Sequence, residues 1–246
     1  MNVLDIFSGI GGFSLGLERA GMRTVAFCEI DPYCRAVLRK HWPDVPCYED
    51  VRLLTAQRMH ADGIVADVIC GGFPCQDVSF AGSGLALDGE RSGLWSEMFR
   101  LIREVRPRYA IIENVAALAV RGLGQILRDL ASIRFDAEWD TVSACSLGAP
   151  HMRRRMFIVA YPDGINGWSR LRNSDARKVG TLQAIDGLAR ARTRFRERLA
   201  NPSALYRGAD GLAFGMERNR AIGNSVFPQI PEIIGRAIMS AISTGK

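Results

Sequence analysis

One cysteine of the sequence stands in a setting that suits nucleophilic chemistry. The run GGFPCQ at residues 71–76 directly follows the apolar stretch Asp67 to Gly71, which is typical of a buried β-strand. Ligands bind at the carboxyl ends of the strands in open α/β sheets, so we expect Cys75 at such an edge. A thiol there can act as a nucleophile when positive charge or hydrogen-bond donors favour the thiolate. A lone cysteine is more often a small buried apolar residue, so the interpretation depends on its neighbours.

The neighbouring motifs favour catalysis at Cys75. A second apolar run begins at Tyr109 and ends in Glu-Asn-Val, and Glu113 at a sheet edge beside a nucleophile is a candidate proton donor. The glycine-rich stretch at residues 80–92 lies between the two runs and suits a mobile lid. Three consecutive arginines at residues 153–155 precede a further apolar run and begin a basic segment.

A glycine turn near the N-terminus predicts a nucleotide-like ligand. Gly9, Gly11 and Gly12 follow the β-type run at residues 3–7 and precede a helical pattern, so the backbone can approach a ligand at the helix N-terminus. Glu29 ends a second β-type run twenty residues after Gly9, where a carboxylate can accept hydrogen bonds from ribose hydroxyls. This pattern predicts an adenosine-containing cofactor. A purely structural glycine turn is the alternative.

The elements that must position these residues alternate between β-type runs and helical patterns, which is typical of βαβ units in a parallel, doubly wound α/β sheet. Asp31 and Pro32 provide an N-cap and a first-turn proline for one helix. The last helix carries isoleucines on one face, and we expect it to return to the sheet. The expected strands cover residues 3–7, 24–28, 67–71, 109–113 and 156–161, and further helices cover residues 13–20, 92–105, 123–133 and 228–242.

Composition and charge narrow the class of protein. The 246 residues are 48% apolar and 24% charged, as in an ordinary globular protein, and no apolar run approaches the ~18 residues of a membrane span. Asp5 stands where a signal peptide would be apolar, so we expect a cytoplasmic protein. The six cysteines include no C-x-x-C pair, so neither a metal site nor a disulfide framework is expected.

Positive charge is concentrated in one segment. Residues 1–152 carry 15 basic and 19 acidic side chains, whereas residues 153–220 carry 15 and 6, and 14 of those 15 are arginines. The arginine fork matches phosphate, so this segment favours a nucleic-acid partner. A solvated surface face is the alternative. The alternating pattern also breaks after Tyr161, which predicts a small irregular second lobe at residues 161–220.

In order and in approximate spacing, these motifs resemble those of the DNA (cytosine-5) methyltransferases of prokaryotic and phage type. The resemblance covers roughly residues 1–160 and the last 30 residues. It implies a Rossmann-like methyltransferase sheet with a catalytic and cofactor-binding domain at residues 1–160, a target-recognition lobe at 161–220 and a returning C-terminal motif and helix at 221–246. The motifs that carry it are residues 5–13, Glu29, residues 50–51, 72–76, 113–115, 151–155 and 223–226.

The resemblance implies S-adenosyl-L-methionine as the cofactor. Glu29 would hold the ribose, Ile30 would pack on the adenine, and Asp50 would accept a hydrogen bond from the adenine amino group. The other residues implied at this site line the turn or close over the methionine end: Phe7, Ser8, Gly9, Gly11, Gly12, Phe13, Val51, Pro74, Leu94, Asn224 and Val226.

The resemblance also implies a covalent mechanism on a cytosine that is flipped out of double-stranded DNA. The Cys75 thiolate would add to C6 of the ring, Glu113 would bond N3 and the exocyclic amine, and Arg155 would bond O2. Arg153 belongs to the same catalytic set. The DNA contacts that we expect are Gln76, Ser79, Arg190, Arg192 and Arg194.

The chain departs from the family pattern at two places. His151 stands where the family usually has glutamine, and only about 60 residues separate Tyr161 from Gly223, so the recognition lobe is short. Two alternatives therefore stay open: a catalytically weak or inactive homologue that binds DNA or a partner, and a methyltransferase of RNA cytosine. The intact motifs argue against the first and the run QDVS at residues 76–79 against the second. We expect a monomer, with or without a restriction endonuclease counterpart.

Overall fold

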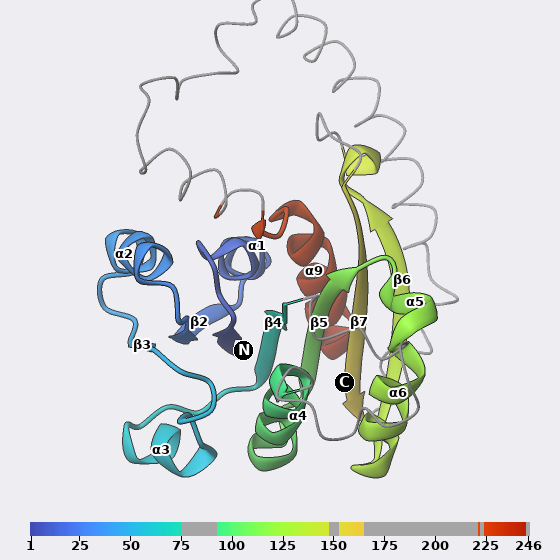
Figure 1. The fold of residues 1–246 in the computed structure, drawn as a ribbon, viewed down its shortest axis with the longest axis horizontal. Coiled ribbons are helices and arrows are strands. Elements are labelled where there is room, and N and C mark those ends of the chain that lie inside the picture. The colour runs from blue at the N-terminus through green and yellow to red at the C-terminus, as the bar shows by residue number, and fades with distance from the viewer. Residues whose placement is uncertain (75–92, 148–152, 165–220, 222–223, 245–246) are drawn as a thin grey trace, which may run out of the picture.

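The computed structural model describes residues 1–74, 93–147, 153–164, 221 and 224–244. Its seven strands form one mixed sheet in the order β3-β2-β1-β4-β5-β7-β6 (Figure 1). The strands are β1 (Asn2–Ile6), β2 (Arg23–Cys28), β3 (Cys47–Tyr48), β4 (Val68–Gly72), β5 (Tyr109–Val115), β6 (Phe135–Ser143) and β7 (Arg154–Pro162). The helices are α1 (Gly12–Arg19), α2 (Pro32–His41), α3 (Ala56–Ala61), α4 (Gly93–Val105), α5 (Leu118–Arg121), α6 (Leu123–Ser132) and α9 (Gln229–Thr244), with a 3-10 turn, η2, at Ala144–Leu147.

The sheet confirms the predicted doubly wound α/β architecture. β1 to β5 are parallel, and the chain runs from β1 to β2 and β3 on one side and through β4 and β5 on the other. Strand order therefore reverses between β1 and β4, which is the switch point where such sheets bind ligands. The sheet is mixed at one side, because β7 runs antiparallel to both β5 and β6.

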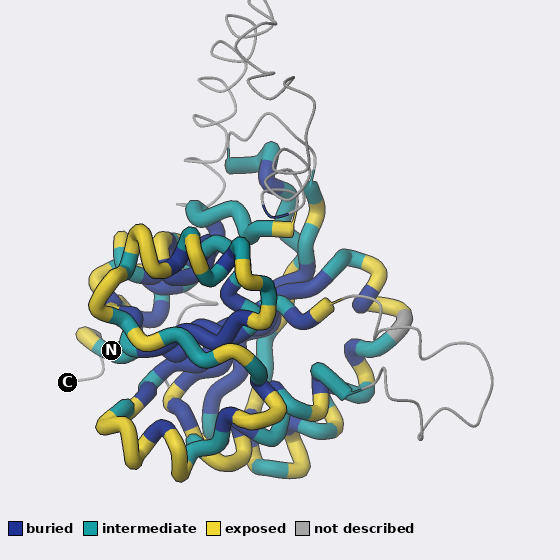
Figure 2. The backbone as a smooth tube through the Cα atoms, turned by 60° about the vertical axis from the view of Figure 1, so that its left-hand side comes forward, coloured by how far each residue is buried: buried dark blue, intermediate teal, exposed yellow. Residues whose placement is uncertain are grey.

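Two layers of helices cover the sheet. The inward residues of α4 and α6 share one buried cluster with Leu4 and Ile6 of β1. Those of α1 and α9 share another with Val3, because successive strand residues face opposite sides. The central strands β1, β4 and β5 are almost entirely buried, and Figure 2 shows buried backbone between helices whose outer faces are exposed. The core therefore lies on both faces of the sheet. The edge formed by the carboxyl ends of the parallel strands carries turns and loops.

The last helix returns to the sheet as the sequence predicts. α9 packs against α1, and a Cβ added at Gly235 would lie 2.7 Å from the Cβ of Ala20, so glycine allows the two helices to approach closely. In Figure 1, α9 lies beside α1, although more than 200 residues separate them in the sequence. The end of the chain is thereby brought next to its beginning.

Local signals explain where the elements begin. Asp31 caps α2, because its Oδ1 accepts hydrogen bonds from the backbone N–H groups of Tyr33 (2.9 Å) and Cys34 (3.3 Å), and Pro32 starts the helix as predicted.

Within the described part of the chain, no helix is long and apolar enough to cross a membrane. The expected lid at residues 80–92 and residues 165–220 of the expected basic lobe lie outside the described residues.

Candidate active site

The turn between β1 and α1 has an unusual backbone. Phe7 (φ 53°), Gly9 (φ 53°) and Gly11 (φ 84°) all adopt left-handed conformations. Such a conformation is uncommon for phenylalanine and persists only where surrounding contacts enforce it. Ser8 provides one such contact, because its hydroxyl donates to the carbonyl of Asp5 at 2.6 Å. A Cβ placed on Gly9 would meet nothing within 4 Å, so the turn faces open space that a ligand can enter.

Glu29 is held beside this turn by backbone donors. Its Oε2 accepts a hydrogen bond from the N–H of Gly9 at 2.7 Å, and its Oε1 accepts one from Asp31 at 2.8 Å. Each carboxylate oxygen has two lone pairs, so the group can still accept two hydroxyls. The adjacent Ile30 side chain is 62% exposed, which is unusual for isoleucine and leaves an apolar surface next to the carboxylate. The pair therefore offers acceptors and an apolar face to one ligand.

The two residues expected at the end of β3 have different surroundings. Asp50 accepts hydrogen bonds from the Arg52 side chain at 2.8 to 3.1 Å, and these bonds lower the pKa of Asp50. Val51 is buried in the core cluster of α4 and α6. Asp50 is thus an ionised acceptor near the surface, whereas the Val51 side chain packs inside.

The C-terminal motif lies against the N-terminus of α1. A Cβ added at Gly12 would lie 2.5 Å from the carbonyl oxygen of Val226, so only glycine fits there. Arg153 binds the same segment, since its Nη2 donates to the carbonyl of Asn224 at 3.1 Å. The structure therefore brings residues 224–226, the turn and the arginine motif together, although they are far apart in the sequence.

Other expected cofactor residues are placed differently. Phe13 is only 3% exposed, and its ring contacts Phe157 edge-to-face with centroids 6.2 Å apart. Its described contacts are therefore with the core beneath the turn. Leu94 is partly buried near the start of α4 against the opposite cluster, and Pro74 is exposed just after β4.

Glu113 and Arg155 form an ion pair at the end of β5. Nε of Arg155 lies 2.9 Å from Oε1 of Glu113, and Glu113 is 7% exposed. Burial raises the pKa of Glu113, and the positive charges of Arg155 and Arg153 limit the rise. Gly72 lies directly across in β4, where a Cβ would be 2.5 Å from Oε2 of Glu113. The arrangement suits a carboxyl group that exchanges a proton next to a cation.

Arg153 is the second cation at this edge. Its burial, together with the neighbouring charge of Arg155, lowers the pKa of Arg153. Arg155 itself donates through Nη1 to the carbonyl of Arg154 at 2.9 Å. Two guanidinium groups thus converge where β5 and β7 pair, a setting suited to the binding of a group that gains negative charge.

Two positioning residues were missed by reasoning from the sequence. Asn114, 2% exposed, donates through Nδ2 to the carbonyl of Phe73 at 3.0 Å. The Trp95 ring packs on Phe73 with centroids 5.7 Å apart, and its Nε1 donates to Asp129 at 2.7 Å. The available signal for Asn114 was a polar amide inside an apolar strand run, which must find a partner when buried. Trp95 carried no signal beyond its place on an amphipathic helix.

Several expected site residues cannot be placed. Cys75, Gln76, Ser79, Arg190, Arg192 and Arg194 lie outside the described residues. Phe73 and Pro74, which directly precede Cys75, are described and end at the carboxyl edge beside Glu113. The described residues also contain no cluster of three or more histidine, cysteine or acidic residues that could hold a metal ion.

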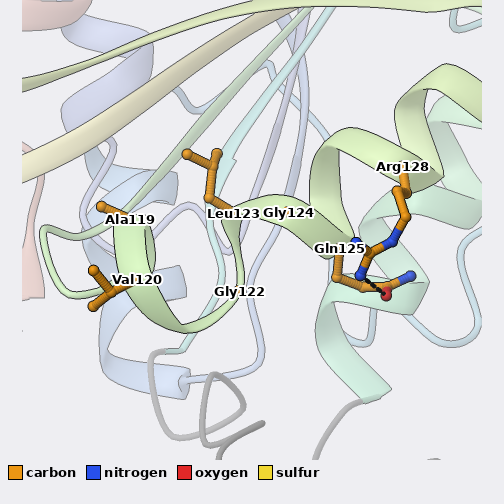
Figure 3. Close-up of a pocket in the computed structure, with 7 residues that line it drawn as sticks. All are labelled: Ala119, Val120, Gly122, Leu123, Gly124, Gln125 and Arg128. Atoms are coloured by element: carbon orange, nitrogen blue, oxygen red, sulfur yellow. Dashed lines mark hydrogen bonds between the residues drawn. The ribbon is translucent and has the colours of Figure 1, made fainter.

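A shallow pocket of about 260 Å³ lies apart from these residues (Figure 3). It is formed by α5, the start of α6 and the link between them, and Arg128 there donates to Gln125 at 2.9 Å. None of the residues expected to bind cofactor or substrate lines it. The residues that line it are Ala119, Val120, Gly122, Leu123, Gly124, Gln125 and Arg128.

Comparison with known proteins gives consistent matches. Residues 1–195 match the family described as C-5 cytosine-specific DNA methylase. The chain is 36% identical over 168 residues to the type II methyltransferase M2.BsuMI of Bacillus subtilis (strain 168), which covers 65% of this chain and 42% of that protein. It is 32% identical over 200 residues to M.PspPI of Psychrobacter sp. (strain TA137), covering 75% of this chain and 48% of that protein.

A solved structure also resembles the fold. It belongs to a prophage-encoded Escherichia coli protein assigned as a DNA modification methyltransferase, with a TM-score of 0.58 and 29% identity over 67% of this chain and 47% of the other. The chain thus spans a little less than half the length of these three relatives.

Proposed function

The chain belongs to the family of C-5 cytosine-specific DNA methylases, and from this premise we propose that it transfers a methyl group from S-adenosyl-L-methionine to C5 of cytosine in double-stranded DNA. The observation that carries the proposal is the position of two groups at one sheet edge. Glu29 and the glycine turn lie on one side of the switch point, and the Glu113–Arg155 pair lies on the other. A cofactor held at the glycine turn and a cytosine held at the ion pair can therefore meet at the switch point.

The residues at the turn fit the proposed cofactor. When bound, S-adenosylmethionine supplies an electrophilic methyl group on a sulfonium. Glu29 retains free lone pairs for ribose hydroxyls, Ile30 exposes an apolar face for the adenine, and Asp50 is an ionised acceptor for the adenine amine. Gly9 leaves open space for the ligand. The remaining proposed contacts are Phe7, Ser8, Gly11, Gly12, Val51, Pro74, Leu94, Asn224 and Val226, and Phe13 supports the turn from the core.

The catalytic residues act on the cytosine ring. Its C5 is too weak a nucleophile, so the Cys75 thiolate adds to C6 and the electron pair of the C5–C6 double bond moves toward C5. Protonated Glu113 donates to N3 as charge enters the ring, and Arg155 donates to O2. Burial supports this role, because it raises the pKa of Glu113 and favours the protonated form. Attack of C5 on the methyl group would break its bond to sulfur and release the cofactor as a neutral thioether, and the N3 proton would return to Glu113. A base then removes the C5 proton, the C5–C6 double bond re-forms, and the bond from C6 to the Cys75 thiolate breaks.

The substrate geometry follows from the chemistry. A thiolate cannot reach the face of a stacked base, so the cytosine must be flipped out of the duplex at a cost of a few kcal/mol. Gln76 and Ser79 would then contact the DNA near the flipped base, and Arg190, Arg192 and Arg194 would contact backbone phosphates. We propose that the protein acts as a monomer in a modification system, with or without a restriction endonuclease.

The proposal is tested with tritiated S-adenosylmethionine and two substrates, duplex DNA and tRNA. Wild type should label DNA, and Cys75→Ser should abolish labelling while cofactor binding is retained. Cys145→Ser, which removes a free thiol outside the proposed site, is the matched control and should retain activity. A duplex containing 5-fluorocytosine should become covalently attached to wild type but not to Cys75→Ser. Label in neither substrate would overturn the catalytic proposal, and label in tRNA alone would favour an RNA methyltransferase.

A further inference from the structure

A carboxyl group is buried directly beneath the cofactor turn. The side chain of Asp5 on β1 has no exposed surface and lies on the face of the sheet that α1 covers. An isolated carboxylate is costly to bury, so its retention at this position calls for a role. Asp5 is not among the residues assigned to the cofactor or to the cytosine.

Asp5 supplies a cap that α1 lacks. The N-cap residue of α1 is Gly11, which has no side chain to satisfy the free N–H groups of the first turn. Oδ2 of Asp5 instead accepts a hydrogen bond from the backbone N–H of Ser14 at 3.2 Å and one from its hydroxyl at 2.7 Å. The carboxyl group on β1 therefore holds the first turn of α1.

These bonds join the two ends of the cofactor turn. Asp5 lies just before the left-handed Phe7, and Ser14 lies just after the left-handed Gly11. The carbonyl of Asp5 also accepts the Ser8 hydroxyl at 2.6 Å. Asp5 at the start of the turn thus accepts hydrogen bonds from Ser8 within the turn and from Ser14 at its end.

The surroundings of Asp5 raise the pH at which its carboxyl group ionises. The groups that face the carboxyl are Ser14 from α1, Cys70 from β4 and, at the end of β2, Glu29. Of the charged residues of α1 and α9, Arg19, Glu232 and Arg236 pair with one another, and Glu18 accepts a hydrogen bond from Nε1 of Trp42 at 3.0 Å. Burial raises the pKa of Asp5 to about 7 and the charge of Glu29 adds to the rise, whereas the hydrogen bonds from Ser14 and from the Cys70 side chain oppose it.

We propose that Asp5 is a positioning residue whose ionised carboxylate fixes the cofactor turn through Ser14, so that cofactor affinity rises as Asp5 loses its proton. A charged acceptor makes hydrogen bonds roughly twice as strong as a neutral one, so protonation loosens the hold on Ser14. The inference rests on the proposed function, because the ligand is S-adenosylmethionine. By linkage, cofactor binding must in turn favour ionisation of Asp5 and release part of a proton near pH 7.

Calorimetric titration with S-adenosylmethionine tests the inference without methyl transfer. We compare wild type with Asp5→Asn, which is nearly isosteric and cannot ionise, and with Asp67→Asn, a control whose carboxylate accepts the N–H of Asn2 at the opposite end of β1. Wild type and the control should bind several-fold more tightly at pH 8 than at pH 6. They should also release protons on binding at pH 7, detected by repeating the titration in buffers of different ionisation enthalpy. Asp5→Asn should lose both effects.

Urea denaturation provides a readout that needs no ligand. The folded-state pKa of Asp5 lies above the ordinary 3.8, so the folded state holds a proton that the unfolded state has lost between about pH 4 and pH 7. The contribution of Asp5 is therefore fully present below pH 4 and is lost as pH rises toward 7. Subtracting the Asp5→Asn profile from the wild-type profile should show this decline.

The possible outcomes separate the two proposals. Failure of wild type to bind S-adenosylmethionine at any pH would overturn the cofactor assignment, and the inference with it. Binding by wild type with the same pH dependence and proton release in Asp5→Asn would overturn the inference alone. Ser14→Ala, which removes the shorter of the two hydrogen bonds and keeps the backbone one, should weaken cofactor binding at pH 8 more than at pH 6.

Discussion

The side-chain amide of Asn114 donates a hydrogen bond to the carbonyl of Phe73, which joins the end of β5 to the segment that follows β4. The amide is oriented, because its Oδ1 accepts the N–H of Val115 at 2.8 Å. Phe73 precedes Pro74 and Cys75 in the sequence. Asn114 therefore fixes the backbone from which the proposed nucleophile follows, while its neighbour Glu113 forms the ion pair with Arg155.

Replacement of Asn114 should impair catalysis more than cofactor binding. Asn114→Ala leaves the buried carbonyl of Phe73 unpaired, which should lower the free energy of unfolding by about 1–3 kcal/mol. Misplacement of the nucleophile should reduce the single-turnover rate of methyl transfer on the order of 10²-fold. The control is Asn2→Ala, which removes an exposed hydrogen bond from the side-chain amide of Asn2 to the carbonyl of Val65. Equal rates for the two variants would contradict a positioning role for Asn114.

Gly72 should be essential because a side chain at this position would occupy the space of the Glu113 carboxyl group. In Gly72→Ala the new Cβ would lie 2.5 Å from Oε2, so the carboxyl must move away from its position beside Arg155. We expect a loss of about 1–3 kcal/mol in stability and a severe loss of methyl transfer. Gly93→Ala is the matched control, since a Cβ there would meet nothing within 4 Å. Full activity of Gly72→Ala would show that the position of Glu113 is not critical.

The elements that the sequence predicted have strong local signals. The glycine turn, the Asp31 cap and the apolar runs of β1, β4 and β5 each depend on neighbouring residues. β6 was missed because Asp136, Glu138 and Asp140 make residues 135–143 resemble a polar loop. An edge strand tolerates these charges, and they discourage pairing with another chain. The reversed direction of β7 depends on long-range pairing, which local pattern does not reveal.

In the candidate site, too, the sequence indicated residues with local signals but not the contacts that depend on long-range pairing. The sequence singled out Glu113 and Arg155 by type and motif, but not their 2.9 Å approach, which depends on the register of β5 and β7. Phe13 was expected at the cofactor and is found packed in the core. It shares the inward face of α1 with Leu17, four residues later, and that face packs against Phe157.

Loss of Arg155 should make stability more dependent on pH. In Arg155→Leu the Glu113 carboxyl stays buried without its ion-pair partner, so the pKa of Glu113 should rise further. Its folded-state pKa is then well above the unfolded value, and stability is lost as pH rises through it. Urea denaturation should show a destabilisation relative to wild type that is larger at pH 8 than at pH 5.5, by about 1–3 kcal/mol. Adding Glu113→Gln should remove this pH dependence; if it persists, another group is responsible.

The alternating arginines should set the salt dependence of DNA binding. Each phosphate contact contributes about 0.9 to the slope of log affinity against log salt concentration. Replacing Arg190, Arg192 and Arg194 with glutamine should therefore reduce the slope by roughly 1 per arginine, measured by fluorescence anisotropy. The control replaces three arginines on segments leading into β4, β5 and β6, at the amino edge of the sheet: Arg58, Arg103 and Arg134. An equal effect in both triple variants would show only a general response to charge.

Trp95 should couple α6 to the segment before Cys75. Its Nε1 donates to Oδ2 of Asp129, whose Oδ1 accepts from Gln125 at 2.7 Å, and Gln125 accepts from Arg128 (Figure 3). Trp95→Phe should keep the ring contact with Phe73 and lose only the hydrogen bond, which should cost about 1–2 kcal/mol of stability with little change in turnover. Trp95→Ala should cost about 3–5 kcal/mol and also slow methyl transfer, because Phe73 loses its packing partner.

The comparison with Trp139 separates packing at Phe73 from a general effect of tryptophan loss. Trp139 on β6 is 49% exposed, so Trp139→Phe and Trp139→Ala should each change stability by less than their Trp95 counterparts. Methyl transfer is measured below the unfolding transition of every variant, so the comparison reports on turnover of folded protein. If Trp95→Ala turns over as fast as Trp139→Ala under those conditions, the contact with Phe73 stabilises the fold but does not position the nucleophile.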